Sequence, residues 1–141
     1  MTVQPEQEQR IVAAIEAAER LTSGEVRVHL NNRCSGNALR EAQKAFEKLG
    51  MHRTAERNGI LFYLALESHQ FAVIGDQGIH AKVGQAFWDG IRDAMIPQFK
   101  ADQWVAALEL GIAEAGRALG EHFPHQGTRD RDELSNDVSR G

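Results

Sequence analysis

The sequence predicts an α/β protein: a three-layer α/β/α sandwich, Rossmann-like, with a small mixed sheet that contains one antiparallel hairpin. The first observation behind this prediction is the order of the segments, in which helical and extended patterns alternate along the chain. The second is size. A chain of 141 residues with 42% hydrophobic content can bury roughly two-thirds of its unfolded surface without a disulfide or metal. We therefore expect a single domain over residues 1–124.

The first half of the chain predicts a helix, a strand and a second helix. Pro5 to Leu21 begins with proline and acidic residues and places apolar side chains on one face, as amphipathic helices do. Glu25 to Leu30 alternates polar and apolar side chains and is predicted as a strand. Asn37 is suited to cap a second helix, whose apolar stripe includes Leu39 and which Gly50 ends.

A buried hairpin is the element around which the rest of the chain is organised. Gly59 to Leu66 is an apolar run too short for a helix, which predicts a strand buried on both faces. Gln70 to Gly75 predicts a second strand, and the short polar connection between the two favours an antiparallel hairpin. Asp76 follows in a glycine-containing turn, after which the chain is expected to become helical.

Two longer helices and a polar tail complete the prediction. Gln85 to Lys100 carries apolar residues at helical spacing, and Pro97 is expected to kink or end this helix. Gln103 to Phe123 has the cleanest amphipathic pattern of the chain and is expected to pack on the sheet. Residues 125–141 contain few apolar side chains, so a disordered polar tail is expected there.

The predicted strand directions bring several polar residues to one end of the sheet. A right-handed crossover makes the first two strands parallel, and the hairpin makes the third antiparallel to the second. The starts of the first two strands, at Glu25 and Asn58, then meet the end of the third strand at Asp76. Arg57 and His80 are close to these positions in the sequence. This end of the sheet is the candidate site.

Oxygen-bearing side chains at this end of the sheet suit a hard cation. Asp76, Glu25 and Asn58 offer two carboxylates and an amide, which with water could supply the oxygen ligands that Ca²⁺ or Mg²⁺ prefers. Each residue also has a structural interpretation. Asp76 is suited to cap the following helix, Asn58 to form a turn, and Glu25 to lie in solvent at the start of a strand.

A second, weaker set of side chains could hold a phosphate group. Arg57, His80 and Lys82 surround the predicted start of a helix, where cationic side chains and backbone amides favour anions. The alternative is that His80 and Lys82 are ordinary residues of a surface helix.

Composition and motifs exclude several classes of function. The formal net charge is −4 and no basic face is visible, so we expect no nucleic-acid partner. The sequence has no nucleophile elbow, phosphate loop or dinucleotide-binding glycine motif, and its single Cys34 cannot form an internal disulfide. The N-terminus lacks a signal-peptide layout, and no apolar run approaches the ~20 residues needed to cross a bilayer. We expect a cytoplasmic chain that does not itself insert into a membrane.

Three segments resemble one known family. The runs ERNGILFYLAL, FAVIGDQGIH and FWD…IPQF are similar, in order, to motifs of the TPM domain family, named for a thylakoid lumen phosphatase, a photosystem II repair protein and a nematode acetylcholine-receptor modulator. The resemblance covers about Gln9 to about Phe123. It implies an α/β/α Rossmann-like fold and, for some plant members, acid phosphatase activity with a bound divalent metal. The turn Gly75-Asp76-Gln77-Gly78-Ile79 matches the shorter soluble variety of the family. Many bacterial members of the family have no assigned activity.

Two functions from different classes follow. The first is a non-catalytic module that binds a protein or membrane-associated partner. The alternative is a divalent-metal-assisted phosphate-ester hydrolase at the Glu25, Asn58 and Asp76 end of the sheet, with Ca²⁺ or Mg²⁺ as the cation. The first is favoured, because the sequence offers no strong nucleophile or general base.

Overall fold

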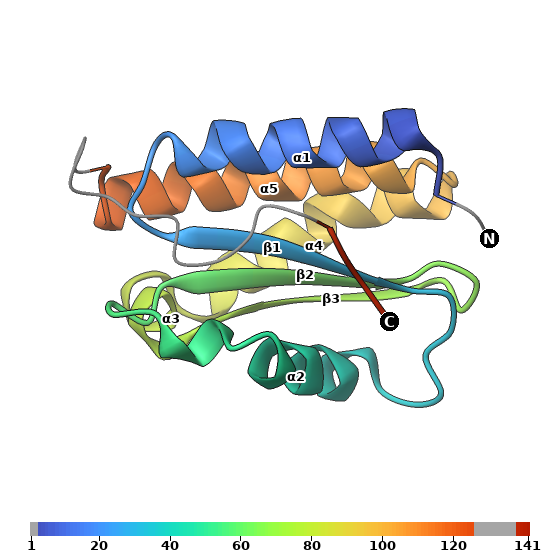
Figure 1. Cartoon of the computed structure of the whole chain (residues 1–141), viewed down its shortest axis with the longest axis horizontal. Coiled ribbons are helices and arrows are strands. Elements are labelled where there is room, and N and C mark those ends of the chain that lie inside the picture. Colours follow the sequence, from blue (N-terminus) through green and yellow to red (C-terminus); the bar gives the residue numbers. More distant parts are fainter. Residues whose placement is uncertain (1–2, 126–137) are drawn as a thin grey trace.

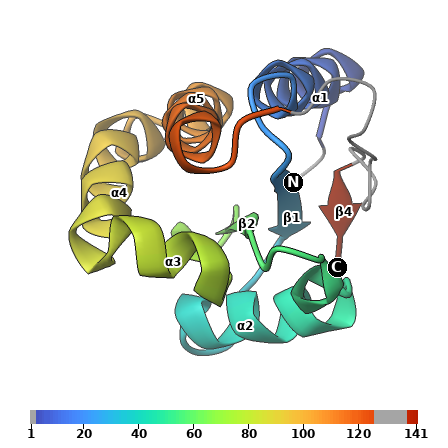
Figure 2. The ribbon, with the colours of Figure 1, turned by 90° about the vertical axis from the view of Figure 1, so that its left-hand side faces the viewer.

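The computed structural model describes residues 3–125 and 138–141 and arranges the elements in three layers (Figure 1). The helices are α1 (Pro5–Glu19), α2 (Ala38–Lys48), α3 (Gln77–Val83), α4 (Gln85–Lys100) and α5 (Trp104–His122), with a short 3-10 helix η1 (Met51–Arg53). The strands are β1 (Glu25–Asn31), β2 (Gly59–Ala65), β3 (Gln70–Gly75) and β4 (Ser139–Arg140). Viewed end-on, α1, α5 and α4 lie over one face of the sheet and α2 under the other (Figure 2). The α/β prediction is confirmed.

The sheet has the order β3-β2-β1-β4. β1 and β2 are parallel, with Glu25 opposite Gly59, and β2 and β3 form the antiparallel hairpin, with Ile60 opposite Gly75. Both pairings are as predicted. The register matters for the site, because it brings the beginning of β1, the beginning of β2 and the end of β3 to the same end of the sheet.

β2 is the centre of the core. All seven of its residues are buried, as expected for a strand covered on both faces. Ile60, Phe62 and Leu64 belong to the larger core cluster, which α1, α4 and α5 complete. Leu61 and Tyr63 lie in two smaller clusters with residues of α2. Among the helices that the structure describes, none combines the length and apolar character required to span a bilayer.

Helix ends largely follow the sequence signals, with one exception. The Asn37 side chain accepts hydrogen bonds from the amides of Leu39 and Arg40, as a cap should. Pro97, however, does not end its helix, because α4 continues to Lys100. Proline deprives the carbonyl four residues earlier, at Asp93, of its hydrogen bond. Both residues are exposed, so water can satisfy that carbonyl and the helix tolerates the proline.

The last residues of the chain differ from the predicted disordered tail. Residues 126–137 lie outside the described part, but 138–141 are ordered, and β4 pairs in parallel with β1 at His29 and Leu30. The Val138 side chain is 9% exposed, and the Gly141 amide donates to the Leu30 carbonyl at 3.0 Å. A strand added to a sheet edge is held mainly by backbone hydrogen bonds, which leave little trace in composition.

Candidate functional site

The predicted end of the sheet is assembled as the strand directions require. Glu25 lies opposite Gly59, Asn58 precedes Gly59, and the Asp76 amide donates to the Gly59 carbonyl at 2.9 Å. The exposed fractions of Glu25, Asn58 and Asp76 are 2%, 1% and 7%. Glu25 is therefore not the solvated residue that its position at a strand start suggested. Three polar side chains are buried together at this end of the sheet.

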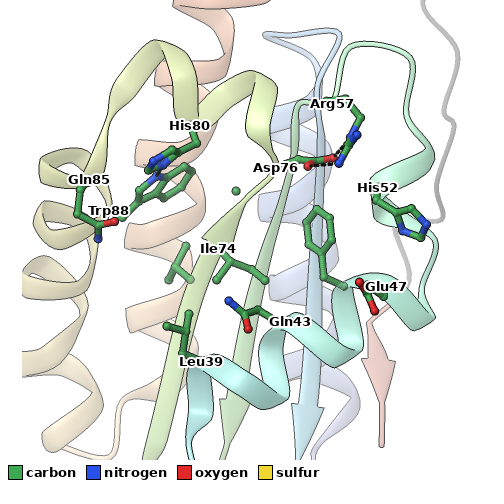
Figure 3. A pocket seen from close by; sticks show the side chains of 13 residues that line it. Leu39, Gln43, Glu47, His52, Arg57, Ile74, Asp76, His80, Gln85 and Trp88 are labelled. Atoms are coloured by element: carbon green, nitrogen blue, oxygen red, sulfur yellow. Dashed lines mark hydrogen bonds and ion pairs between the residues drawn. The ribbon is translucent and has the colours of Figure 1, made fainter.

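Asp76 is held by a cation and by the helix that it begins. The Arg57 Nε donates to Asp76 Oδ2 at 2.6 Å and Arg57 Nη2 to Asp76 Oδ1 at 2.8 Å, a bidentate pair visible in Figure 3. The Gln77 amide also donates to Oδ1, at 2.8 Å, so the predicted capping role is confirmed. The hydrogen bond to Asp76 raises the pKa of the Arg57 guanidinium. Both carboxylate oxygens are thus engaged within the protein.

Backbone contacts explain why Arg57 reaches Asp76. Arg57 has a φ of 54°, in the left-handed region, and its carbonyl accepts hydrogen bonds from the amides of Gly78 at 2.8 Å and Ile79 at 3.3 Å. A Cβ atom on Gly78 would lie 2.2 Å from the Glu56 carbonyl oxygen. Only glycine therefore lets the first turn of α3 touch the segment before β2.

A cleft of about 460 Å³ opens beside this ion pair, and we call it the Asp76 cleft. Figure 3 shows its walls, with Leu39, Gln43 and Glu47 of α2 on one side and His80 and Trp88 on the other. The full lining is Leu39, Gln43, Phe46, Glu47, His52, Arg57, Val73, Ile74, Gly75, Asp76, His80, Gln85 and Trp88. Apolar and polar side chains are mixed, as in many binding sites.

His80 and Trp88 form one wall as a unit. The indole Nε1 of Trp88 donates to His80 Nδ1 at 2.8 Å, and the planes of the two rings are nearly parallel, with an interplanar angle of 11°. Because Nδ1 accepts this bond, Nε2 carries the hydrogen of the neutral imidazole and can donate a hydrogen bond. A Cβ atom on Gly75 would lie 2.3 Å from the Trp88 ring, so the absence of a side chain there lets the indole lie against β3.

The structure brings some predicted site residues together and separates others. Arg57, Asp76 and His80 line the cleft, whereas Lys82 is exposed on α3 and lies outside the lining. Glu25 and Asn58 are buried behind the cleft and do not line it.

Trp88 and His52 are among the cleft residues that the sequence analysis did not single out. The helical spacing of Trp88 favours a core position, and the residue is buried, but it also forms the cleft wall. His52 lies in η1, a segment without periodicity, so no sequence signal pointed to it.

In this arrangement Asp76 cannot ligate a hard cation without giving up hydrogen bonds that it makes within the protein. Ca²⁺ and Mg²⁺ require several free oxygen ligands, but both Asp76 oxygens already accept hydrogen bonds. The Asn58 Nδ2 atom, a donor, is buried without a hydrogen-bond partner among the described residues. No group of three or more His, Cys, Asp or Glu side chains in the described part is placed to hold a metal ion. Arg57 supplies the positive charge beside Asp76.

Comparisons with known proteins agree on the fold. A family model described as TPM domain matches residues 2–118. The NMR structure of BA42 from the psychrophilic bacterium Bizionia argentinensis is 40% identical, with a TM-score of 0.90, covering 100% of this chain and 97% of that one.

Two more distant solved structures share the fold alone. The N-terminal domain of cg2496 from Corynebacterium glutamicum is 16% identical, with a TM-score of 0.68 and coverage of 94% and 82% of the two chains. The N-terminal domain of a P. gingivalis protein is 21% identical, with a TM-score of 0.65 and coverage of 88% and 82%. The comparison with curated proteins found no match.

Proposed function

The chain belongs to the TPM domain family, and on that premise we propose that it is a non-catalytic module that binds a protein partner, including a partner held at a membrane. One observation carries this proposal. The buried carboxylate at the Asp76 cleft is fully engaged by Arg57 and by the start of α3. It therefore holds the cleft in shape, and it cannot coordinate a cation with these oxygens without giving up some of these bonds.

The lining of the cleft supports binding. Phe46, Ile74 and Leu39 provide apolar contact area, while Gln43 and Gln85 provide amide groups that both donate and accept hydrogen bonds. Such a mixture suits a polypeptide segment, whose apolar side chains can contact the apolar residues while its backbone N–H and C=O groups bond to the amides. The lining contains no serine, threonine, cysteine, lysine or tyrosine, so its side chains of the types used as covalent nucleophiles are Glu47, His52, Asp76 and His80.

The alternative proposal is a divalent-metal-assisted phosphate-ester hydrolase with Ca²⁺ or Mg²⁺. It is favoured by one observation: Arg57 and His80, a phosphate-binding cation and a hydrogen-bond donor, line the same cleft. This function requires that Arg57 leave Asp76, since the carboxylate cannot serve both cations with the same oxygens.

A hydrolysis assay separates the two proposals. The full chain is incubated with p-nitrophenyl phosphate and Ca²⁺, Mg²⁺ or a chelator, alongside Asp76→Asn and the exposed-site control Asp93→Asn. We expect the rate of the buffer blank in every case. Metal-dependent hydrolysis that Asp76→Asn abolishes and Asp93→Asn leaves unchanged would establish the hydrolase and overturn the binding module.

A further inference from the structure

We propose that the open edge of β3 receives an extended segment of a partner protein as an additional strand. The proposal rests on the binding function above, and it names the binding surface and the class of partner. The surface is a groove that runs along β3 between α2 and α4, and we call it the β3 groove.

The backbone of β3 has an open edge. β3 is the last strand of the sheet and pairs only with β2 among the described strands. The Asp76 amide donates a hydrogen bond to the Gly59 carbonyl. Because the pattern alternates along an antiparallel pair, the N–H and C=O groups of Ile74, Ala72 and Gln70 also point towards β2. Phe71, Val73 and Gly75 are the intervening residues, and their N–H and C=O groups point away from the sheet. These are the groups that an added strand would pair with.

Two cavities show that the groove follows this edge. The Asp76 cleft is lined by α2 residues from one face of the sheet and by Trp88 from the other. A second cavity of about 290 Å³ is likewise lined by Ala38 of α2 and by Ile96 and Phe99 of α4. A cavity lined from both faces of a sheet must pass around its edge. Together the two cavities are lined by every residue of β3 except Ala72.

The edge lacks the features that normally protect such strands. Exposed edge strands usually carry charged residues, proline or a bulge, which prevent unwanted pairing. β3 has the sequence QFAVIG, with no charge and no proline. The opposite edge of the sheet is paired with β4 at His29 and Leu30. In addition, Leu39 on the α2 wall is 48% exposed and offers apolar surface to whatever enters the groove.

The depth of the groove favours a peptide over a second copy of the chain. Both cavities are lined by residues of α2 on one face of β3 and of α4 on the other, so the two helices flank the edge of the strand. A second copy would present its own β3 between the same flanking helices, so the helices would meet before the two edges could pair. A single extended segment carries no flanking helices, so it can enter between α2 and α4 and reach the edge of β3.

The groove also specifies the chemistry of the segment. β3 has six residues, so the added strand spans roughly 20 Å. Its alternate side chains would lie against α2 on one side and α4 on the other, and both walls contain apolar residues. The end near Gln70 is lined by His69 and Lys100 and by no carboxylate. We infer an uncharged apolar run with an acidic residue at the Lys100 end.

The test begins with peptides. A library of random dodecapeptides displayed on phage is selected on the full chain, and the selected peptides are synthesised with single N-methyl groups at successive residues. In an added strand, alternate amides face β3. Methylation at those residues should weaken binding roughly tenfold or more, and methylation at the residues between should change it less than about twofold. Failure to select any peptide, or losses without alternation, would overturn strand addition.

Charge reversal tests the polarity of the segment. Lys100→Glu should weaken binding of the acidic peptides about fivefold, while Lys82→Glu, an equal change outside the groove, should not. Equal effects of the two substitutions would overturn the predicted polarity of the segment.

Sedimentation tests the alternative occupant. If the chain forms a dimer and the peptides dissociate it, a second copy of the chain occupies the edge of β3. Peptides that bind elsewhere would overturn strand addition but leave the binding module intact, whereas hydrolysis in the assay above would overturn the module itself.

Discussion

At the residue scale, the Arg57–Asp76 pair decides how the candidate site is interpreted. Topology alone predicted that Glu25, Asn58 and Asp76 would meet, because strand direction fixes which ends of the strands are neighbours. It did not predict that Arg57 would engage both oxygens of Asp76. That contact depends on the left-handed backbone of Arg57 and on the close approach at Gly78, neither of which leaves a periodic signal in the sequence.

Two substitutions at Asp76 separate capping from charge. Asp76→Ala removes the acceptor for the Gln77 amide, a loss of about 1 kcal/mol at a helix cap. Asp76→Asn keeps that acceptor and one hydrogen bond to Arg57, so thermal unfolding should rank wild type, then Asn, then Ala. The control Asp93→Asn should stay within about 0.5 kcal/mol of wild type. Equal melting temperatures for Asn and Ala would show that the capping bond contributes nothing.

His29 gives the stability a pH dependence. Burial lowers the pKa of His29, with the hydrogen bond to Asn31 acting in the opposite direction. As pH falls below about 6.5, the unfolded chain takes up a proton that the folded chain resists, so the free energy of unfolding decreases until the folded pKa is passed. Urea unfolding at pH 7.5 and 5 should show a larger loss for wild type than for His29→Gln. Equal losses would contradict the lowered pKa.

At the scale of single elements, local signals were sufficient for most of the fold. Periodicity and caps predicted α1, α2, α4, α5 and the hairpin, because each depends on neighbouring residues. β4 was missed, since a short strand is defined by the edge that it joins. Leu39 was predicted in the buried stripe of α2, yet it is exposed, because its helix projects past the last strand.

The start of α3 depends on close backbone contact at Gly78. Gly78→Ala would place a Cβ atom 2.2 Å from a carbonyl oxygen of the preceding segment, so we expect a loss of roughly 2 kcal/mol or more. Gly90→Ala is the matched control, because nothing lies within 4 Å of its Cβ position in α4. It should stabilise the chain by roughly 0.5–1 kcal/mol through helix propensity. Chemical denaturation measures both, and a neutral Gly78→Ala would contradict the contact.

β4 should contribute measurably to stability. Removing residues 138–141 exposes the site of Val138 and the edge of β1, and we expect a loss of about 2 kcal/mol. Arg140→Gln breaks only the exposed ion pair with Glu8 and should cost less than about 0.5 kcal/mol. If the shortened chain melts within a degree of wild type, these residues do not hold the sheet edge.

At the scale of the whole molecule, the two edges of the sheet differ within residues 3–125 and 138–141. The β1 edge is paired with β4, while the β3 edge lies in a groove between α2 and α4. The core that contains α1, α5 and β2 lies next to β3 and supports it through the β2–β3 pairing. The described part of the molecule therefore presents one strand with an open edge, as expected of a binding module and not required of a hydrolase.

Amide hydrogen exchange across β3 tests strand addition most directly. In the free chain, the amides of Phe71, Val73 and Gly75 point away from β2 and should exchange fast, while those of Ala72 and Ile74 should be protected. A selected peptide should slow the first three and leave the other two unchanged. If the peptide instead protects amides elsewhere, or leaves Phe71, Val73 and Gly75 exchanging as in the free chain, the partner does not bind as an added strand.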